Sequence, residues 1–206
     1  MQRHLGAQNH HVAPKGASHA ALAAPRLSDL PPFPKVERRA QAVPPGLALR
    51  SARSGDLQFL LRLYGETRTA ELSLTPWSEA QKQAFITDQF SLQHLHYVQR
   101  NPHADFWLIE RIGLDGRHEP IGRLYLDRSE REWRAIDLCL LTKARSAGIG
   151  GAVIRSIQKA ALETEADSVT LYVEKTNHGA RRLYARLGFE EAPSPFPGHC
   201  RMRWSP

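Results

Sequence analysis

The apolar residues of this chain repeat with two different periods, and the change between them separates predicted helices from predicted strands. From Leu57 onward, apolar side chains recur at i, i+3, i+4 and i+7, which predicts an amphipathic helix with Asp56 as its N-cap. Ser78 with Gln81 three residues later matches a capping box, so a second and longer helix is predicted from there to about Gln99.

Outside these helices, short apolar runs and turn residues predict strands. The runs lie at 47–50, 106–109, 121–126 and 135–141, and a turn at 113–116 separates two of them. Close spacing of the last three runs predicts an antiparallel meander. Further along, the pattern predicts a helix at 149–162, an alternating strand at 169–174, a short helix at 180–187 closed by Gly188, and a final strand around Met202 and Trp204. The predicted order is β-α-α-β-β-β-α-β-α-β-β, an α/β fold with a mixed, largely antiparallel sheet flanked by helices.

Residues 1–45 differ in composition from the rest of the chain. They are rich in Ala, Pro and His and hold few large apolar residues, so a disordered extension is predicted, followed by one folded domain at 46–206. The first 28 residues carry no acid, which resembles a transit peptide; a flexible extension and a start site assigned too far upstream are the alternatives.

Charge and cysteine content narrow the class of protein. The formal net charge is +7, but six of the 28 Lys and Arg and only two of the 21 Asp and Glu fall in residues 1–45. The near-neutral remainder argues against a nucleic-acid-binding face. Cys139 and Cys200 form no metal-binding pattern and are predicted to be reduced, buried thiols. No apolar stretch reaches the roughly 20 residues of a membrane span, so a cytoplasmic protein without a membrane partner is predicted.

One glycine-rich segment, Arg145-Ser146-Ala147-Gly148-Ile149-Gly150, links a predicted strand to a predicted helix. Backbone amides at a helix start can surround a phosphate, and glycines let the backbone approach it closely. Gly148 and Gly150 are placed for that, Gly151 adds clearance, and Arg145 can add a charge-assisted contact. The segment alone is as typical of an ordinary strand-to-helix turn.

Two later motifs give the segment a context. Asn177 follows the next predicted strand, and Leu183-Tyr184-x-x-x-Gly188-Phe189 covers the next helix. In this order the three motifs resemble the GNAT acyl-CoA N-acyltransferases, over roughly residues 47–204. The resemblance implies acetyl-CoA as acyl donor and transfer of its acetyl group, by direct attack, to a primary amine of a small molecule or a protein N-terminus. It leaves the acceptor open and is compatible with a homodimer.

The resemblance also implies roles for individual residues. Tyr184 would protonate the departing thiolate, Asn177 would contact the cofactor, and Arg145 would assist at the phosphates. The backbone amides that would hold the pyrophosphate are those of Ser146, Ala147, Gly148, Ile149, Gly150 and Gly151. The exposed strand backbone that would pair with the pantetheine arm belongs to Leu138, Cys139 and Leu140. Tyr184 also lies on the apolar stripe of its helix, where a core tyrosine is the alternative.

The general base is less clear from the residues. Asp137 is an acid inside an apolar strand, and a buried carboxylate must be paired or have a raised pKa, which suits a base. A structural partner for Arg123 or Arg134 is an equal alternative. Glu174 is a second candidate.

Two other functions fit parts of the sequence. Gly148-x-Gly150-x-x-Val153 is a Rossmann-type dinucleotide fingerprint without its third glycine, with Glu174 about where a ribose-binding acid would stand. Too few residues follow Glu174 for the rest of that fold. A non-catalytic acyl-CoA-binding sensor or interaction module is the other alternative.

Overall fold

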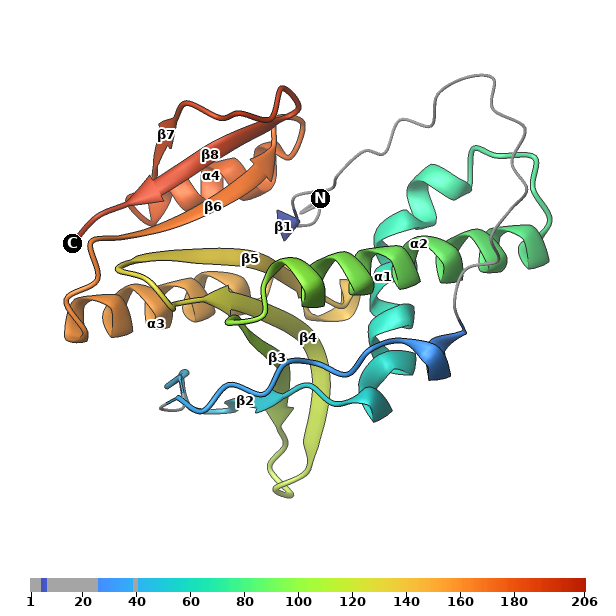
Figure 1. The fold of residues 1–206 in the computed structure, drawn as a ribbon, viewed down its shortest axis with the longest axis horizontal. Coiled ribbons are helices and arrows are strands. Elements are labelled where there is room, and N and C mark those ends of the chain that lie inside the picture. The colour runs from blue at the N-terminus through green and yellow to red at the C-terminus, as the bar shows by residue number, and fades with distance from the viewer. Residues whose placement is uncertain (1–4, 7–25, 39–40) are drawn as a thin grey trace.

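The computed structural model describes residues 5–6, 26–38 and 41–206, and these form one mixed sheet with helices on both faces (Figure 1). The strands are β1 (Leu5–Gly6), β2 (Leu47–Ser51), β3 (Asp105–Ile112), β4 (His118–Asp127), β5 (Glu132–Leu140), β6 (Ser168–Glu174), β7 (Glu190–Ala192) and β8 (His199–Trp204). The helices are α1 (Leu57–Leu72), α2 (Glu79–Arg100), α3 (Ile149–Glu163) and α4 (His178–Arg186). From β2 onward this is the predicted order of elements, which is confirmed.

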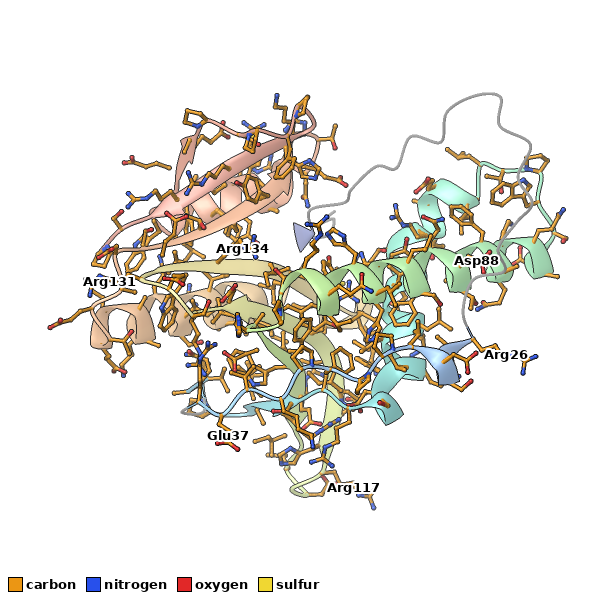
Figure 2. All side chains as sticks on the ribbon, in the orientation of Figure 1. Arg26, Glu37, Asp88, Arg117, Arg131 and Arg134 are labelled. Carbon is orange, nitrogen blue, oxygen red and sulfur yellow. The ribbon has the colours of Figure 1, made fainter. Side chains whose placement is uncertain are left out.

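The sheet runs β2-β3-β4-β5-β6-β8-β7, and all its neighbouring strands are antiparallel except β5 and β6. The antiparallel meander predicted for the middle strands is therefore present as β3, β4 and β5. The hairpin between β3 and β4 projects from the body with Arg117 at its tip (Figure 2).

Side chains of the sheet alternate between two apolar cores. In β3, Trp107 and Ile109 belong to the core that includes α3 and α4, whereas Phe106 and Leu108 belong to the core that includes α1 and α2. This period-2 alternation is what a strand covered on both faces requires. Buried apolar surface on both sides accounts for the near-continuous apolar runs seen in the sequence.

Helix ends follow local sequence signals. Ser78 and Gln81 form the predicted capping box, each side chain accepting from the other's backbone amide. Gly188, with φ +81°, closes α4 as predicted, and Phe189 and Gly188 donate to the Tyr184 and Ala185 carbonyls in a Schellman pattern.

Asp56 stands at the predicted N-cap of α1, yet its carboxylate does not bond the amides of that helix. It accepts from the Arg53 amide at 2.8 Å and from two nitrogens of Arg50. Arg50 on β2 holds the carboxylate with two parallel N–H···O bonds between opposite charges, a geometry that a single helix amide does not offer.

Residues 26–38 differ from the predicted disordered extension. Leu30 and Phe33 are 6% and 7% exposed and belong to the core beside α1 and α2. The ring centroids of Phe33 and His94 are 4.8 Å apart. Arg38 reaches Asp105 at 3.5 Å. A few spaced apolar residues among prolines are enough to anchor this stretch because an existing core receives them. Residues 1–4, 7–25 and 39–40 of the predicted extension lie outside the described residues.

No helix among the described residues has the length and apolar character to cross a membrane.

We predict that Phe33→Ala lowers the free energy of unfolding of the full chain by about 3 kcal/mol, because it removes a buried ring from a packed site. Glu37→Ala, a neighbouring exposed position, is the control and should change it by less than about 0.5 kcal/mol. Urea unfolding measures both. Equal midpoints for the two variants would show that this stretch is not anchored.

Candidate active site

The sheet opens between β5 and β6. These strands pair in parallel only from Glu132 with Ser168 to Ala135 with Leu171, after which no β6 residue pairs with β5. β6 instead continues in register with β8 up to Glu174 opposite His199. One edge of β5 therefore faces the opening from about residue 136 to 140, as Figure 1 shows where the two strands diverge. Leu138, Cys139 and Leu140 all lie on this edge.

The other edge of β5 stays paired with β4, so β5 is held in place along the opening. Arg123 stands opposite Cys139, and Gly122 stands opposite Leu140. A Cβ on Gly122 would lie 2.3 Å from the Cys139 carbonyl oxygen, so only glycine allows this approach. Cys139 is a buried thiol without a disulfide, as is Cys200.

The predicted phosphate loop lies at the end of β5 and leads into α3. Ser146 and Gly148 both have positive φ, 60° and 77°, and Gly148 is the N-cap residue of α3. Such turns direct successive amides toward one side. The first helical amide bonded within α3 is that of Ala152, which donates to Gly148 O. Within the described part of the chain, no hydrogen bond uses the amides of Ser146, Ala147, Gly148, Ile149, Gly150 or Gly151.

Arg145 fixes the loop to the strand. Its Nε donates to the Leu140 carbonyl at 2.9 Å, and the side chain is half-buried. The bond ties the start of the loop to the last residue of β5.

Asn177 caps α4, and Tyr184 lies within that helix. Asn177 is 2% exposed, and its Oδ1 accepts from the Ala180 amide at 3.1 Å as the N-cap of this helix. Tyr184 is 1% exposed, and its ring packs edge-to-face against that of Phe189, with the two ring centroids 5.6 Å apart. Burial, together with the negative charge of Asp137, raises the pKa of Tyr184 well above 10. The Tyr184 hydroxyl therefore keeps its proton throughout the neutral range.

Asp137 is completely buried and paired. Its Oδ2 lies 2.6 Å from the Arg123 guanidinium and accepts from the Tyr97 hydroxyl at 3.2 Å. Arg134, the other partner considered from the sequence, instead donates to the Asn101 side-chain oxygen, and its guanidinium lies 3.8 Å from the Asp127 carboxylate. The second oxygen, Oδ1, is buried without a hydrogen-bond partner in the described part of the chain.

The environment of Asp137 changes its proton affinity. Burial raises the pKa of its carboxyl to about 6, against the lowering effect of the Arg123 charge and of the hydrogen bonds from Arg123 and Tyr97. The Arg123 guanidinium also lies 5.2 Å from the Tyr125 ring centroid. From the sequence Tyr97 is expected only among the residues near the acceptor, and neither its contact with Asp137 nor the place of Tyr125 in this cluster was predicted. The one available signal was Arg123 itself, a charge within the apolar run 121–126.

Glu174 is the last residue of β6 and is half-buried, in register with His199, which is buried. It lies on the far strand of the opening from Asp137. The two base candidates are therefore on opposite walls.

Comparison with known proteins identifies the family. The model of the Acetyltransferase (GNAT) family matches residues 64–189. The chain belongs to this family. The resemblance drawn from the sequence motifs is thereby confirmed, and the family uses acetyl-CoA. The comparisons give no support to the dinucleotide-binding alternative.

Individual relatives share parts of this chain or its fold. A mycothiol acetyltransferase of Corynebacterium jeikeium is 34% identical over 79 residues, which cover 38% of this chain and 23% of that protein. The PaiA N-acetyltransferase of Thermoplasma acidophilum in complex with coenzyme A has a TM-score of 0.56 at 18% identity, covering 78% of this chain and 99% of its own. The dodecameric spermidine N-acetyltransferase of Vibrio cholerae has a TM-score of 0.50 at 17% identity, with 78% and 94% covered.

We predict that Arg123→Met lowers the free energy of unfolding by about 3–5 kcal/mol, because it leaves the Asp137 carboxylate buried without its cation. The double variant Arg123→Met/Asp137→Leu should recover most of that loss. Arg131→Ala, which breaks an ion pair exposed on both sides, should cost less than about 1 kcal/mol. Urea unfolding measures the stability of all three variants. A double variant no more stable than Arg123→Met would contradict the pairing of an ionised Asp137 with Arg123.

Proposed function

We propose that this chain is an acetyl-CoA-dependent N-acetyltransferase that acetylates a primary amine of a small molecule or of a protein N-terminus by direct attack. The observation that carries the proposal is the opening between β5 and β6 that ends at the amides of 146–151. A strand edge followed by a cluster of helix-start amides offers hydrogen bonds to an amide-containing arm and then to a diphosphate.

The described residues fit acetyl-CoA at this place. The edge from Leu138 to Leu140 presents backbone groups that β6 does not use, and Gly148 provides the positive φ that turns the loop amides. Arg145 adds positive charge beside them. When bound there, acetyl-CoA supplies the acetyl thioester.

Tyr184 is the proposed general acid. A thiolate leaving group needs a proton, and a tyrosine whose pKa is raised by burial carries that proton at neutral pH. The Asn177 cap and the Gly188 termination fix the nine-residue helix α4 at both ends, and so fix the position of this hydroxyl. Asn177 is proposed to contact the cofactor from the same helix start.

Asp137 is the proposed proton acceptor for the amine, and the geometry limits how it acts. Oδ2 is held by Arg123 and Tyr97, so Oδ1 is the oxygen with an unused lone pair. A pKa of about 6 suits a base that works near neutrality. The same pair can act by placing negative charge near the protonated acceptor, a positioning role without proton transfer.

Turnover is the direct test. We expect acetyl-CoA consumption with at least one member of a panel of polyamines, amino acids and peptides with free N-termini, and a thermal shift on adding acetyl-CoA but none on adding NAD. Tyr184→Phe should lower kcat by about a hundredfold with acetyl-CoA affinity unchanged.

Tyr64→Phe is the matched control for that variant. Tyr64 is as buried as Tyr184, but its hydroxyl accepts from Arg68 on α1. It should leave kcat within about twofold. Binding of acetyl-CoA without turnover of any amine would favour the non-catalytic sensor instead.

A second prediction concerns the loop. Gly148→Ala should weaken acetyl-CoA binding about tenfold, because a residue with a Cβ disfavours φ +77° and the amides lose their common direction.

Gly116→Ala provides a matched control. Gly116 has φ +74° and nothing within 4 Å of an added Cβ, just as Gly148 has, but it lies in the β3–β4 turn. Both variants should lose similar stability, about 1 kcal/mol. Isothermal titration should show weaker acetyl-CoA binding in Gly148→Ala alone, and equal affinities would count against this loop as the pyrophosphate site.

A further inference from the structure

A strand that the sequence pattern does not predict lies in the opening of the sheet. Leu5 of β1 pairs with Leu138 and Gly6 pairs with Asp137, in antiparallel orientation. β1 also lies against β6, and Figure 1 shows it between β5 and β6 where they diverge. The chain therefore fills part of the opening with its own backbone.

β1 uses the edge of β5 that pairing with β6 leaves available. That pairing ends at Ala135 with Leu171, and β1 takes up the same edge at Asp137, two residues further on. The backbone N–H and C=O groups of a strand on one edge make one set of ladder bonds, so one extended partner at a time can use them. At Leu138 this edge is the one that the proposed function gives to the pantetheine arm.

Resting on the proposed function, we propose that the N-terminal segment at Leu5–Gly6 is a built-in occupant of the acyl-donor channel and competes with acetyl-CoA for β5. The site is an extended-peptide site, which binds by strand addition through backbone hydrogen bonds. Gly6 stands opposite Asp137, so β1 also pairs with the backbone of the residue whose carboxylate is proposed to meet the acceptor amine.

The length of β1 determines how strongly it competes. A two-residue strand makes few ladder bonds, and each contributes only modestly to stability in water. The segment is therefore displaceable: acetyl-CoA binds the fraction of molecules in which the opening is clear, and its apparent dissociation constant rises in inverse proportion to that fraction. Saturating acetyl-CoA removes the effect.

The test uses the full chain with Leu5→Pro/Gly6→Pro, which removes both backbone N–H groups of β1 and leaves the folded body unchanged. Ala17→Pro/Ala20→Pro places the same number of prolines elsewhere in the N-terminal segment and is the control. Isothermal titration should give a dissociation constant for acetyl-CoA that is about threefold to tenfold lower for the β1 variant than for the wild type or the control. With an accepted amine, KM for acetyl-CoA should fall likewise, while kcat at saturation stays the same.

Hydrogen exchange of the peptide covering 136–140, measured without acetyl-CoA, gives a readout that needs no ligand. It should be faster in the β1 variant than in the wild type and the control. Equal exchange together with equal, measurable acetyl-CoA affinities overturns the proposed occlusion and leaves the proposed function in place. Absence of acetyl-CoA binding in every variant overturns the proposed function, and the competition with it.

Discussion

The short parallel pairing of β5 with β6 is the constraint on which the site depends. β5 pairs with β4 from Arg134 to Leu140, whereas β6 pairs with β8, and β5 and β6 pair with each other over only four residue pairs. Where β5 and β6 diverge, the backbone N–H and C=O groups on one edge of β5 lie inside the molecule and do not pair with β6. The backbone groups of a buried strand edge need hydrogen-bond partners, which water, a ligand or another segment of the chain can supply.

A polar cluster lies directly beneath this edge. Arg123 and Asp137 come from neighbouring strands, and Tyr97 comes from α2, so three elements meet at one buried ion pair. Such a pair adds little net stability compared with an apolar core, but removal of one member is costly. The cluster therefore fixes the relative position of β4, β5 and α2. A shift in register between β4 and β5 would separate the charges of Arg123 and Asp137. Because β5 is held in this position relative to β4 and α2, the opening beside it is held in place as well.

Elements with strong local signals could be predicted from the sequence alone. The Ser78 box and the Gly188 stop act through hydrogen bonds within a few residues, so the order of elements and the α4 boundaries followed from spacing. Long-range choices could not be predicted. Nothing local indicates that Asp137 pairs with Arg123 rather than Arg134, because that depends on which strand lies beside β5 and on which face of the sheet each side chain lies. The contact of Tyr97, on the long amphipathic helix α2, with Asp137 could not be predicted for the same reason.

Anchoring by Leu30 and Phe33 has a consequence for any segment that precedes them. They hold the chain beside α2, and in the sequence residues 7–25 lie between β1 and the described segment that contains this anchor. A tether of that length keeps the N-terminal strand at an effective concentration on the order of millimolar near the opening. A dissolved peptide of the same sequence would have to reach that concentration to compete equally. Cleavage of the chain between the anchor and β1 would make the pairing of β1 with β5 a bimolecular association, which is weak at low peptide concentration. Such cleavage would therefore release β1 from the opening irreversibly.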